Sequence, residues 1–232
     1  NPKQSLALAY GLHSRREKLD YYYVEKVVNG KKLSNRYLDL SRAHHFGLTY
    51  DWNINQNLHL KVEPYFQYLF HVPVEEKSSF SVINYEEFYL DRILVNTGKG
   101  RNYGIDITLE QYMKNGFYYM ITGSLFKSKY RGGDNVWRNT RLDKGYLLNL
   151  LAGKEWMVGK LKQNVLSLNG RLYFQGGGRY TPVNKERSQA EHDIVFDETQ
   201  AYSERFSPSI NGDVSFSFRI NKKVVSHEFS VK

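Results

Sequence analysis

The chain has 232 residues, a formal net charge of +9 and no cysteine, and 41% of its residues are hydrophobic. Its mean hydropathy is −0.61, and no apolar run approaches the roughly 20 residues of a membrane helix, so a helical membrane protein is excluded. The lack of cysteine excludes a disulfide scaffold and an all-cysteine metal site. The Lys and Arg residues are scattered through turns without a basic helix or a ribonucleoprotein-type strand motif, which argues against nucleic-acid binding.

Aromatic residues are unusually frequent. They make up 15% of the chain, and 19 of them are Tyr, a residue that suits places where one end of a side chain is apolar and the other wet. A membrane β-barrel is compatible with the low hydropathy, because its polar half cancels its apolar half in any average. An aromatic-rich soluble β-sandwich is the alternative.

The first predicted strands cover residues 5–13, 41–52 and 58–70, and each alternates apolar with polar side chains. A long polar connection, residues 14–40, separates the first two, and a short turn at 53–57 separates the next two. Pro64 lies on the apolar face of the third strand. Because proline has no backbone donor, it predicts a bulge or a weakly paired spot there.

Residues 98–133 predict a long β-hairpin with its turn at Lys114-Asn115-Gly116, since Asn-Gly is a strong hairpin signal. In its first strand Tyr103 and Ile105 begin an apolar face, and the intervening residues form a polar one. An ordinary strand has about 5–6 residues. Strands of about a dozen, polar on one side only, are typical of a sheet that crosses a membrane at a tilt.

Three further strands are predicted at 146–156, 165–175 and 207–220, and a ninth begins after the turn at 221–223. The connections alternate long and short throughout, as in outer-membrane barrels and rarely in soluble domains. The fold class is therefore all-β, an antiparallel up-and-down meander forming one curved sheet. Its convex, lipid-facing side is expected to carry Leu109, Ile121, Leu150, Leu168, Val214 and Phe216, and its concave side Asp106, Thr122, Asn149, Asn169, Arg171 and Ser215.

Several short segments resemble the C-terminal barrel region of TonB-dependent outer-membrane receptors. The segments are Leu8-Ala9-Tyr10-Gly11-Leu12-His13-Ser14, Ala43-His44-His45-Phe46, Gly98-Lys99-Gly100-Arg101-Asn102-Tyr103-Gly104, Ser124-Leu125-Phe126-Lys127-Ser128-Lys129-Tyr130 and Asn149-Leu150-Leu151-Ala152-Gly153-Lys154-Glu155-Trp156. They are most similar to the group of receptors that carries an N-terminal carboxypeptidase-regulatory-like domain ahead of the plug. The resemblance extends over essentially the whole chain.

This resemblance implies a 22-stranded barrel filled by an N-terminal plug, in the outer membrane of a Gram-negative bacterium, with nutrient uptake energised through TonB. Residues 1–232 are then expected to be a partial barrel domain of about nine strands, without the plug, the TonB box and the final strand. The implied partners are the protein's own plug, TonB, outer-membrane lipid and lipopolysaccharide, and a transported ligand. The resemblance leaves that ligand open among iron chelates, vitamins, glycans and peptides. The alternative function is a self-contained β-domain or small barrel that acts as a binding or adhesion module.

No enzyme signature is present, and no catalytic, cofactor or metal site is expected. His192 with its acidic neighbours offers a weak metal alternative, but solvated charges are the default in such a loop. Long loops are the best place to look for ligand contacts, and the candidates there are Trp137, Arg138, Arg141, Arg179, Tyr180 and His192. Candidates for a lumen- or plug-facing role are Asp106, Glu110, Asn149, Asn169, Arg171 and Asp213.

Overall fold

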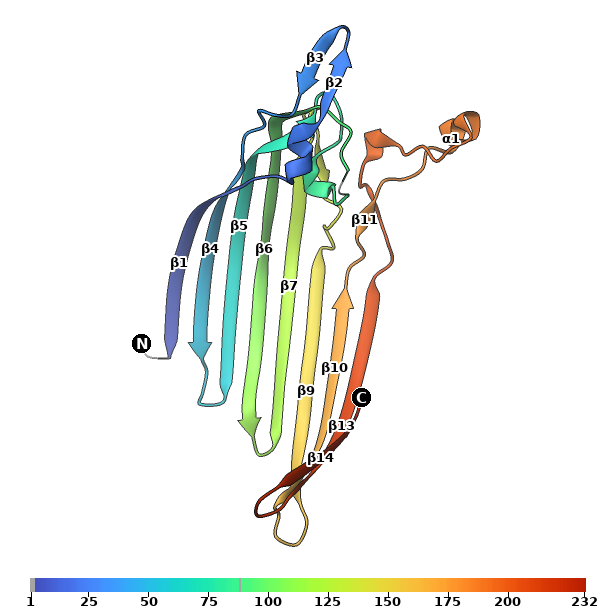
Figure 1. Cartoon of the computed structure of the whole chain (residues 1–232). Helices are drawn as coiled ribbons and strands as arrows, with labels where there is room; N and C mark the ends of the chain where they lie inside the picture. Colours follow the sequence, from blue (N-terminus) through green and yellow to red (C-terminus); the bar gives the residue numbers. More distant parts are fainter. Residues whose placement is uncertain (1–2, 88) are drawn as a thin grey trace.

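A computed structural model describes residues 3–87 and 89–232. Figure 1 shows one tall antiparallel sheet whose long connections gather at one end. Its nine main strands are β1 (Gln4–Arg15), β4 (Ser41–Asn53), β5 (Leu58–Glu75), β6 (Leu94–Lys114), β7 (Phe117–Arg131), β9 (Tyr146–Val158), β10 (Asn164–Gln175), β13 (Ser209–Asn221) and the shorter β14 (Ser226–Val231). They pair in that order, and β8 (Trp137–Asn139) extends the sheet beside β7. The predicted up-and-down meander is confirmed.

The predicted alternation of connections is also confirmed. At the β6–β7 turn Asn115 and Gly116 both have positive φ, 53° and 73°, as a two-residue hairpin loop requires. The long connections contain short elements that the alternation did not predict. These are the hairpin of β2 (Glu25–Val28) and β3 (Lys31–Ser34), the pair β11 (Arg179–Tyr180) and β12 (Glu204–Arg205), the helix α1 (Lys185–Glu191), and the 3-10 helices η1 (Leu19–Tyr23), η2 (Val82–Asn84) and η3 (Glu198–Gln200).

Pro64 weakens the sheet on one side. Toward β6 the ladder is continuous, with Pro64 opposite Ile105. Toward β4 the paired positions stop at Gly47 and Tyr65 and resume at Tyr50 and Val62, so Pro64 falls in a gap. The weakly paired spot expected from the missing backbone donor is confirmed, and the register shifts of β5 lie further along, beyond Leu69.

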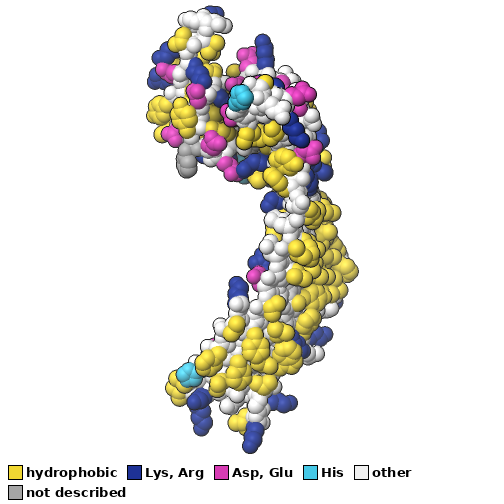
Figure 2. All heavy atoms as spheres, turned by 90° about the vertical axis from the view of Figure 1, so that its right-hand side faces the viewer, with side chains coloured by type: hydrophobic (Ala, Val, Ile, Leu, Met, Phe, Trp, Pro, Cys, Tyr) yellow, Lys and Arg dark blue, Asp and Glu magenta, His cyan; other side chains and the backbone are white. Residues whose placement is uncertain are grey.

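The two faces of the sheet separate apolar from polar side chains as predicted. Leu109, Ile121 and Leu150 occupy one cross-strand row, and Thr108, Thr122 and Asn149 occupy the neighbouring row on the other face. Figure 2 shows hydrophobic side chains along the convex flank, while the loop end overhangs the concave side. On that flank Leu168, Val214 and Phe216 are all exposed. A one-residue slip would reverse every one of these placements, so the observed register fixes both faces.

The long sheet has two open edges. Within the part of the chain that the structure describes, β1 pairs only with β4, and β14 pairs only with β13. The sheet is therefore curved but not closed. No helix among the described residues has the length and apolar content to cross a membrane.

Candidate functional site

The four long connections fold together into a loop cap, which we define as residues 16–40, 76–93, 132–145 and 176–208. Figure 1 places them together at one end of the sheet. The hydrophobic core at this end is built from Tyr21, Val72, Val82, Leu90 and Leu94, all buried. These residues come from two connections and from the ends of β5 and β6. Two long loops are thus packed against the upper strands and against each other.

A buried carboxylate ties the other two connections together. Asp143 is 0% exposed and accepts hydrogen bonds from Arg179 Nε at 2.8 Å and from the backbone N–H of Ser128 at 3.1 Å. Arg205 Nη2 lies 3.4 Å from the same carboxylate. Backbone contact is close here too, because a Cβ at Gly176 would clash with the carbonyl oxygen of Lys144. Charge pairing and glycine packing hold residues 132–145 against residues 176–208.

A second charged pair stiffens the connection after β7. Arg138 donates to both carboxylate oxygens of Asp134, at 3.0 and 2.6 Å. Burial acts to raise the pKa of Asp134, but the Arg138 hydrogen bonds and the backbone N–H of Val136 outweigh it, so the pKa lies below its usual value. The hydrogen bonds that Arg138 donates to Asp134 outweigh burial and raise the pKa of Arg138. The pair stays ionised and fixed in a forked geometry.

A polar cavity of about 300 Å³ lies where residues 76–93 meet residues 176–208. Ser79, Ser81, Asn84 and Arg92 line it from one connection, and its walls from the other are Thr181, Glu198 and Tyr202. Ser79 donates a hydrogen bond to Glu198 across the two connections. Burial raises the pKa of Tyr202, and Glu198 adds to the effect. The hydroxyl, amide, carboxylate and guanidinium groups that line this cavity suit a small polar ligand.

A larger hollow of about 760 Å³ opens between η1 and residues 36–40. Arg16, Tyr22, Tyr23 and Arg36 line it together with three leucines and Glu25. The hydroxyl of Tyr22 is buried without a hydrogen-bond partner among the described residues. This second opening of the loop cap combines cationic and aromatic groups.

The concave face carries polar side chains that bond from one strand to another, and the bond from Tyr118 on β7 to Asn169 on β10 passes over β9. Ser124 donates to Asp106 at 2.5 Å, Tyr118 donates to Asn169 at 2.7 Å, and Arg171 donates to Asn149 at 2.9 Å. All six lumen-facing candidates lie on β6, β9, β10 and β13 in positions that share this face, with Glu110 near the far end of β6. Asp213 is opposite Arg171 in the register. The strands thus bring these candidates onto one polar surface.

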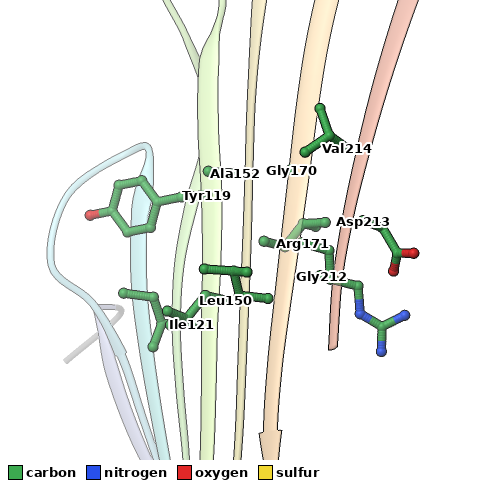
Figure 3. Close-up of a pocket in the computed structure, with 11 residues that line it drawn as sticks. Tyr119, Ile121, Leu150, Ala152, Gly170, Arg171, Gly212, Asp213 and Val214 are labelled. Atoms are coloured by element: carbon green, nitrogen blue, oxygen red, sulfur yellow. The ribbon is translucent and has the colours of Figure 1, made fainter. Parts of the chain in front are cut away.

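A hollow of about 640 Å³ lies on the opposite, convex face, and its character differs entirely. Ala152, Gly170 and Gly212 form its floor on three strands, with Tyr119, Ile121, Leu150, Leu172 and Val214 around them. In Figure 3 the side chains of Arg171 and Asp213 point away from Tyr119 and Ile121. Small residues between large apolar ones produce this hollow, and it offers no charged group to a ligand.

The structure separates the loop candidates by environment. Arg138 and Arg179 are largely buried in the ion pairs already described. Arg141 pairs with Glu86, Tyr180 packs on Phe206 with ring centroids 4.5 Å apart, and both keep part of their side chain exposed. Two candidates remain. His192 is exposed at the C-terminal cap of α1, and Trp137 lies on β8 beside Arg101.

Sequence reasoning missed the residues that organise the loop cap. Asp143, Arg205 and Asn35 are each held by partners from a different connection, and nothing in their local sequence marks them. Ser79, Asn84 and Glu198, which line the polar cavity, are equally unmarked. Among the described residues no three His, Cys, Asp or Glu side chains are grouped so as to hold a metal ion.

No family model matches the chain, and no curated protein matches its sequence. Among solved structures it is similar to the ferric-catecholate import receptor Fiu of E. coli K12 in its closed form, with a TM-score of 0.62 and 9% identity over 96% of this chain and 27% of that one. It is also similar to P. aeruginosa FpvA in complex with a pyoverdine and iron, with a TM-score of 0.61 and 13% identity over 98% and 26%. The chain thus spans about a quarter of the length of each receptor. At this identity the likeness shows only the fold, an antiparallel up-and-down sheet that matches a part of each of these two proteins.

Proposed function

We propose that this chain is part of the wall and outer loops of an outer-membrane receptor of a Gram-negative bacterium, which takes up a nutrient ligand with energy delivered through TonB. The observation that carries the proposal is the division of the sheet into an exposed apolar convex face and a hydrogen-bonded polar concave face over nine strands. Such a sheet suits lipid on one side and a wet or protein-filled lumen on the other. The likeness to the import receptor Fiu and to FpvA, which binds pyoverdines, supports the transport class.

The open edges support a place in a larger barrel. Unpaired backbone groups cost several kcal/mol each in hydrocarbon, so a membrane sheet must close on itself. We therefore propose that residues 1–232 form about nine strands of a 22-stranded barrel domain, in which β1 and β14 each pair with a further strand. The concave face, with Asp106, Asn169 and Arg171, then contacts the protein's own plug or lumen water.

The loop cap is the proposed entry for the ligand. Its polar cavity, lined by Ser79, Asn84 and Glu198, and the hollow beside Arg16 both open among the long connections. Arg141, Tyr180 and His192 keep exposed surface and stay candidates for contact. The two similar receptors handle a ferric catecholate and pyoverdines, which makes a ferric chelate the first ligand to test.

The test separates a membrane receptor from a self-contained binding module. The full-length protein is expected in the outer-membrane fraction, extracted only by detergent, and shifted in electrophoretic mobility on heating, as folded barrels are. Residues 1–232 alone are expected to be insoluble without detergent, because two open edges and a large apolar face are exposed. A monodisperse, detergent-free monomer of residues 1–232 with a cooperative melt would contradict the proposal and favour the binding or adhesion module.

A further inference from the structure

Five cationic side chains lie together on the convex face at the loop end of the sheet. We call this group the rim patch, and its members are Lys99 and Arg101 on β6 and Lys127, Lys129 and Arg131 on β7. They occupy the same alternate positions as Tyr103 and Leu125, whose side chains are exposed on the convex face. The rim patch is therefore continuous with the surface that faces lipid in the proposed receptor.

The rim patch places like charges directly opposite each other. Lys99 is the register partner of Arg131, and Arg101 is the partner of Lys129. Like charges directly opposite on neighbouring strands destabilise a sheet. In the described part of the chain none of the five side chains forms an ion pair or a hydrogen bond, and the Nε atoms of Arg101 and Arg131 are buried without a partner. Cations of the loop cap differ, since Arg138, Arg179 and Arg205 face carboxylates.

Aromatic side chains lie beside the rim patch at the same height of the sheet. Tyr68 lies opposite Arg101, Phe66 lies opposite Tyr103, and Tyr68 and Phe70 stack with ring centroids 6.4 Å apart. Aromatic belts mark the level of lipid headgroups in membrane proteins. The cations thus lie at the level of these aromatic side chains, near the loop end of the sheet, where the phosphate groups of a lipid lie.

One member of the rim patch is held in place before any ligand binds. The guanidinium of Arg101 lies over the ring of Trp137, 4.5 Å from its centroid. Stacking on an aromatic face fixes the plane of a guanidinium and leaves its N–H edge free to bond a phosphate in a forked geometry. Along each strand the cations recur every second residue, roughly 7 Å apart, so the rim patch extends over roughly 13 Å. That length accommodates two phosphate groups.

We propose that the rim patch binds the phosphate groups of the phosphorylated glycolipid in the leaflet on the loop side of the membrane. The proposal rests on the proposed function, because it needs the convex face to lie in an outer membrane. It adds a defined lipid site to that function, formed by Lys99, Arg101, Lys127, Lys129 and Arg131. The phosphates supply the negative charge that the described residues do not, and they relieve the repulsion between the two opposed pairs.

The experiment measures binding of bis-phosphorylated lipid A to the full-length protein in detergent micelles by native mass spectrometry. The test variant is Arg101→Gln with Lys129→Gln, and the matched control is Lys222→Gln with Lys223→Gln at the opposite end of the sheet. Each cation near an anionic surface contributes about a fivefold change in affinity, so the test variant is expected to bind about 30-fold more weakly. The control is expected to bind like the parent protein, and dephosphorylated lipid A is expected to bind weakly to both.

Retention of the heat-dependent shift in mobility shows that a variant is folded, and Lys129→Arg is expected to keep full binding. Equal affinity of the parent protein for phosphorylated and dephosphorylated lipid A would overturn the proposal, as would an unchanged affinity in the folded test variant. An equal loss in the control variant would overturn it too, because the effect would then be one of net charge. A protein that never enters the outer membrane would instead refute the proposed function, so the two failures are distinguishable.

Discussion

Large apolar side chains are exposed on the convex face of the sheet but buried in the loop cap. Val214 on β13 is 67% exposed, whereas Leu90 in the loop cap is 3% exposed. The proposed function accounts for this difference by the surroundings of each region, lipid for the convex face and water for the loop cap. In water, burial of an apolar side chain contributes about 1.5–3 kcal/mol, so the loop cap needs its own small core. A sheet surrounded by lipid needs none, because lipid tails are as apolar as leucine.

Polar groups divide in the same way. On the concave face they form hydrogen bonds between adjacent strands, such as Ser124 to Asp106, and remain partly accessible. In the loop cap they form buried ion pairs between connections far apart in sequence, such as Asp143 with Arg179. The comparison indicates that the loop cap is a folded unit with its own long-range contacts. Changes in one region should therefore leave the other intact.

The largest expected effect comes from removing the carboxylate that joins two connections. Asp143→Asn leaves Arg179 and Arg205 without their counter-charge in a buried site, and breaking a buried pair in this way costs about 3–5 kcal/mol. We expect the amides of residues 132–145 and 176–208 to exchange with deuterium far faster, while those of β10 and β13 keep their protection. Equal loss of protection in the sheet would show that the two regions unfold as one.

The control for this change is an exposed pair in the same loop cap. Arg187 bonds Glu191 at 2.8 Å, and both side chains are at least half exposed. Such a pair contributes about 0–1 kcal/mol, so Arg187→Gln should leave exchange in the loop cap nearly unchanged. A large effect there would mean that charge alone, without burial, stabilises the loops.

A slightly smaller effect is expected from a charge on the convex face. Val214→Arg should lower the free energy of unfolding by about 2–4 kcal/mol if the side chain lies at the bilayer midplane. The matched control is Ser215→Arg, the next residue along the strand, which faces the polar concave side. Reversible urea unfolding of the full-length protein in lipid vesicles measures both. An unchanged stability in Val214→Arg would place this residue outside the hydrocarbon layer.

The sheet was predictable from sequence, and the loop cap was not, for a physical reason. Strand alternation is a local pattern. The faces of Leu109 and Asp106 can be predicted from the few residues around them, and the turn at Asn115-Gly116 from those two residues alone. The partners of Asp143 and Asn35 come from connections that are 36 to 62 residues away, so no local pattern encodes them. The candidate site inherits this limit. The lumen-facing set emerged from periodicity, whereas the residues lining the polar cavity needed the fold.

The rim patch lies between these two cases. The alternation places its five cations on the convex face, and their sequence positions were visible from the start. Their significance depends on register, since only the pairing of Lys99 with Arg131 and of Arg101 with Lys129 shows that like charges are opposed. Pairing partners on neighbouring strands shift together with any slip of one residue. Register is therefore the information that the sequence alone did not supply here.

The smallest expected effect is a dependence of the loop cap on acid. Because the pKa of Asp134 is depressed by Arg138 and the Val136 N–H, its ionised form stabilises the fold. That contribution is fully present above the pKa of an unfolded aspartate, about 3.9, and is lost as the pH falls through the lower folded value. Amides of residues 132–145 should lose protection between pH 4 and pH 2, when the intrinsic change in exchange rate is corrected for.

The sheet supplies the internal reference for this measurement. The amides of β10, which lie far from Asp134 in the sheet order, should keep their protection across the same pH range. In Asp134→Asn the carboxyl no longer titrates, so residues 132–145 should show reduced protection at neutral pH and a flatter response to acid. Other carboxylates of the loop cap titrate in this range, and the pKa of Asp197 is also lowered, chiefly by hydrogen bonds from Thr199. The comparison is therefore made at residues 132–145. If these amides respond to acid as steeply in Asp134→Asn as in the parent protein, the effect belongs to the other carboxylates.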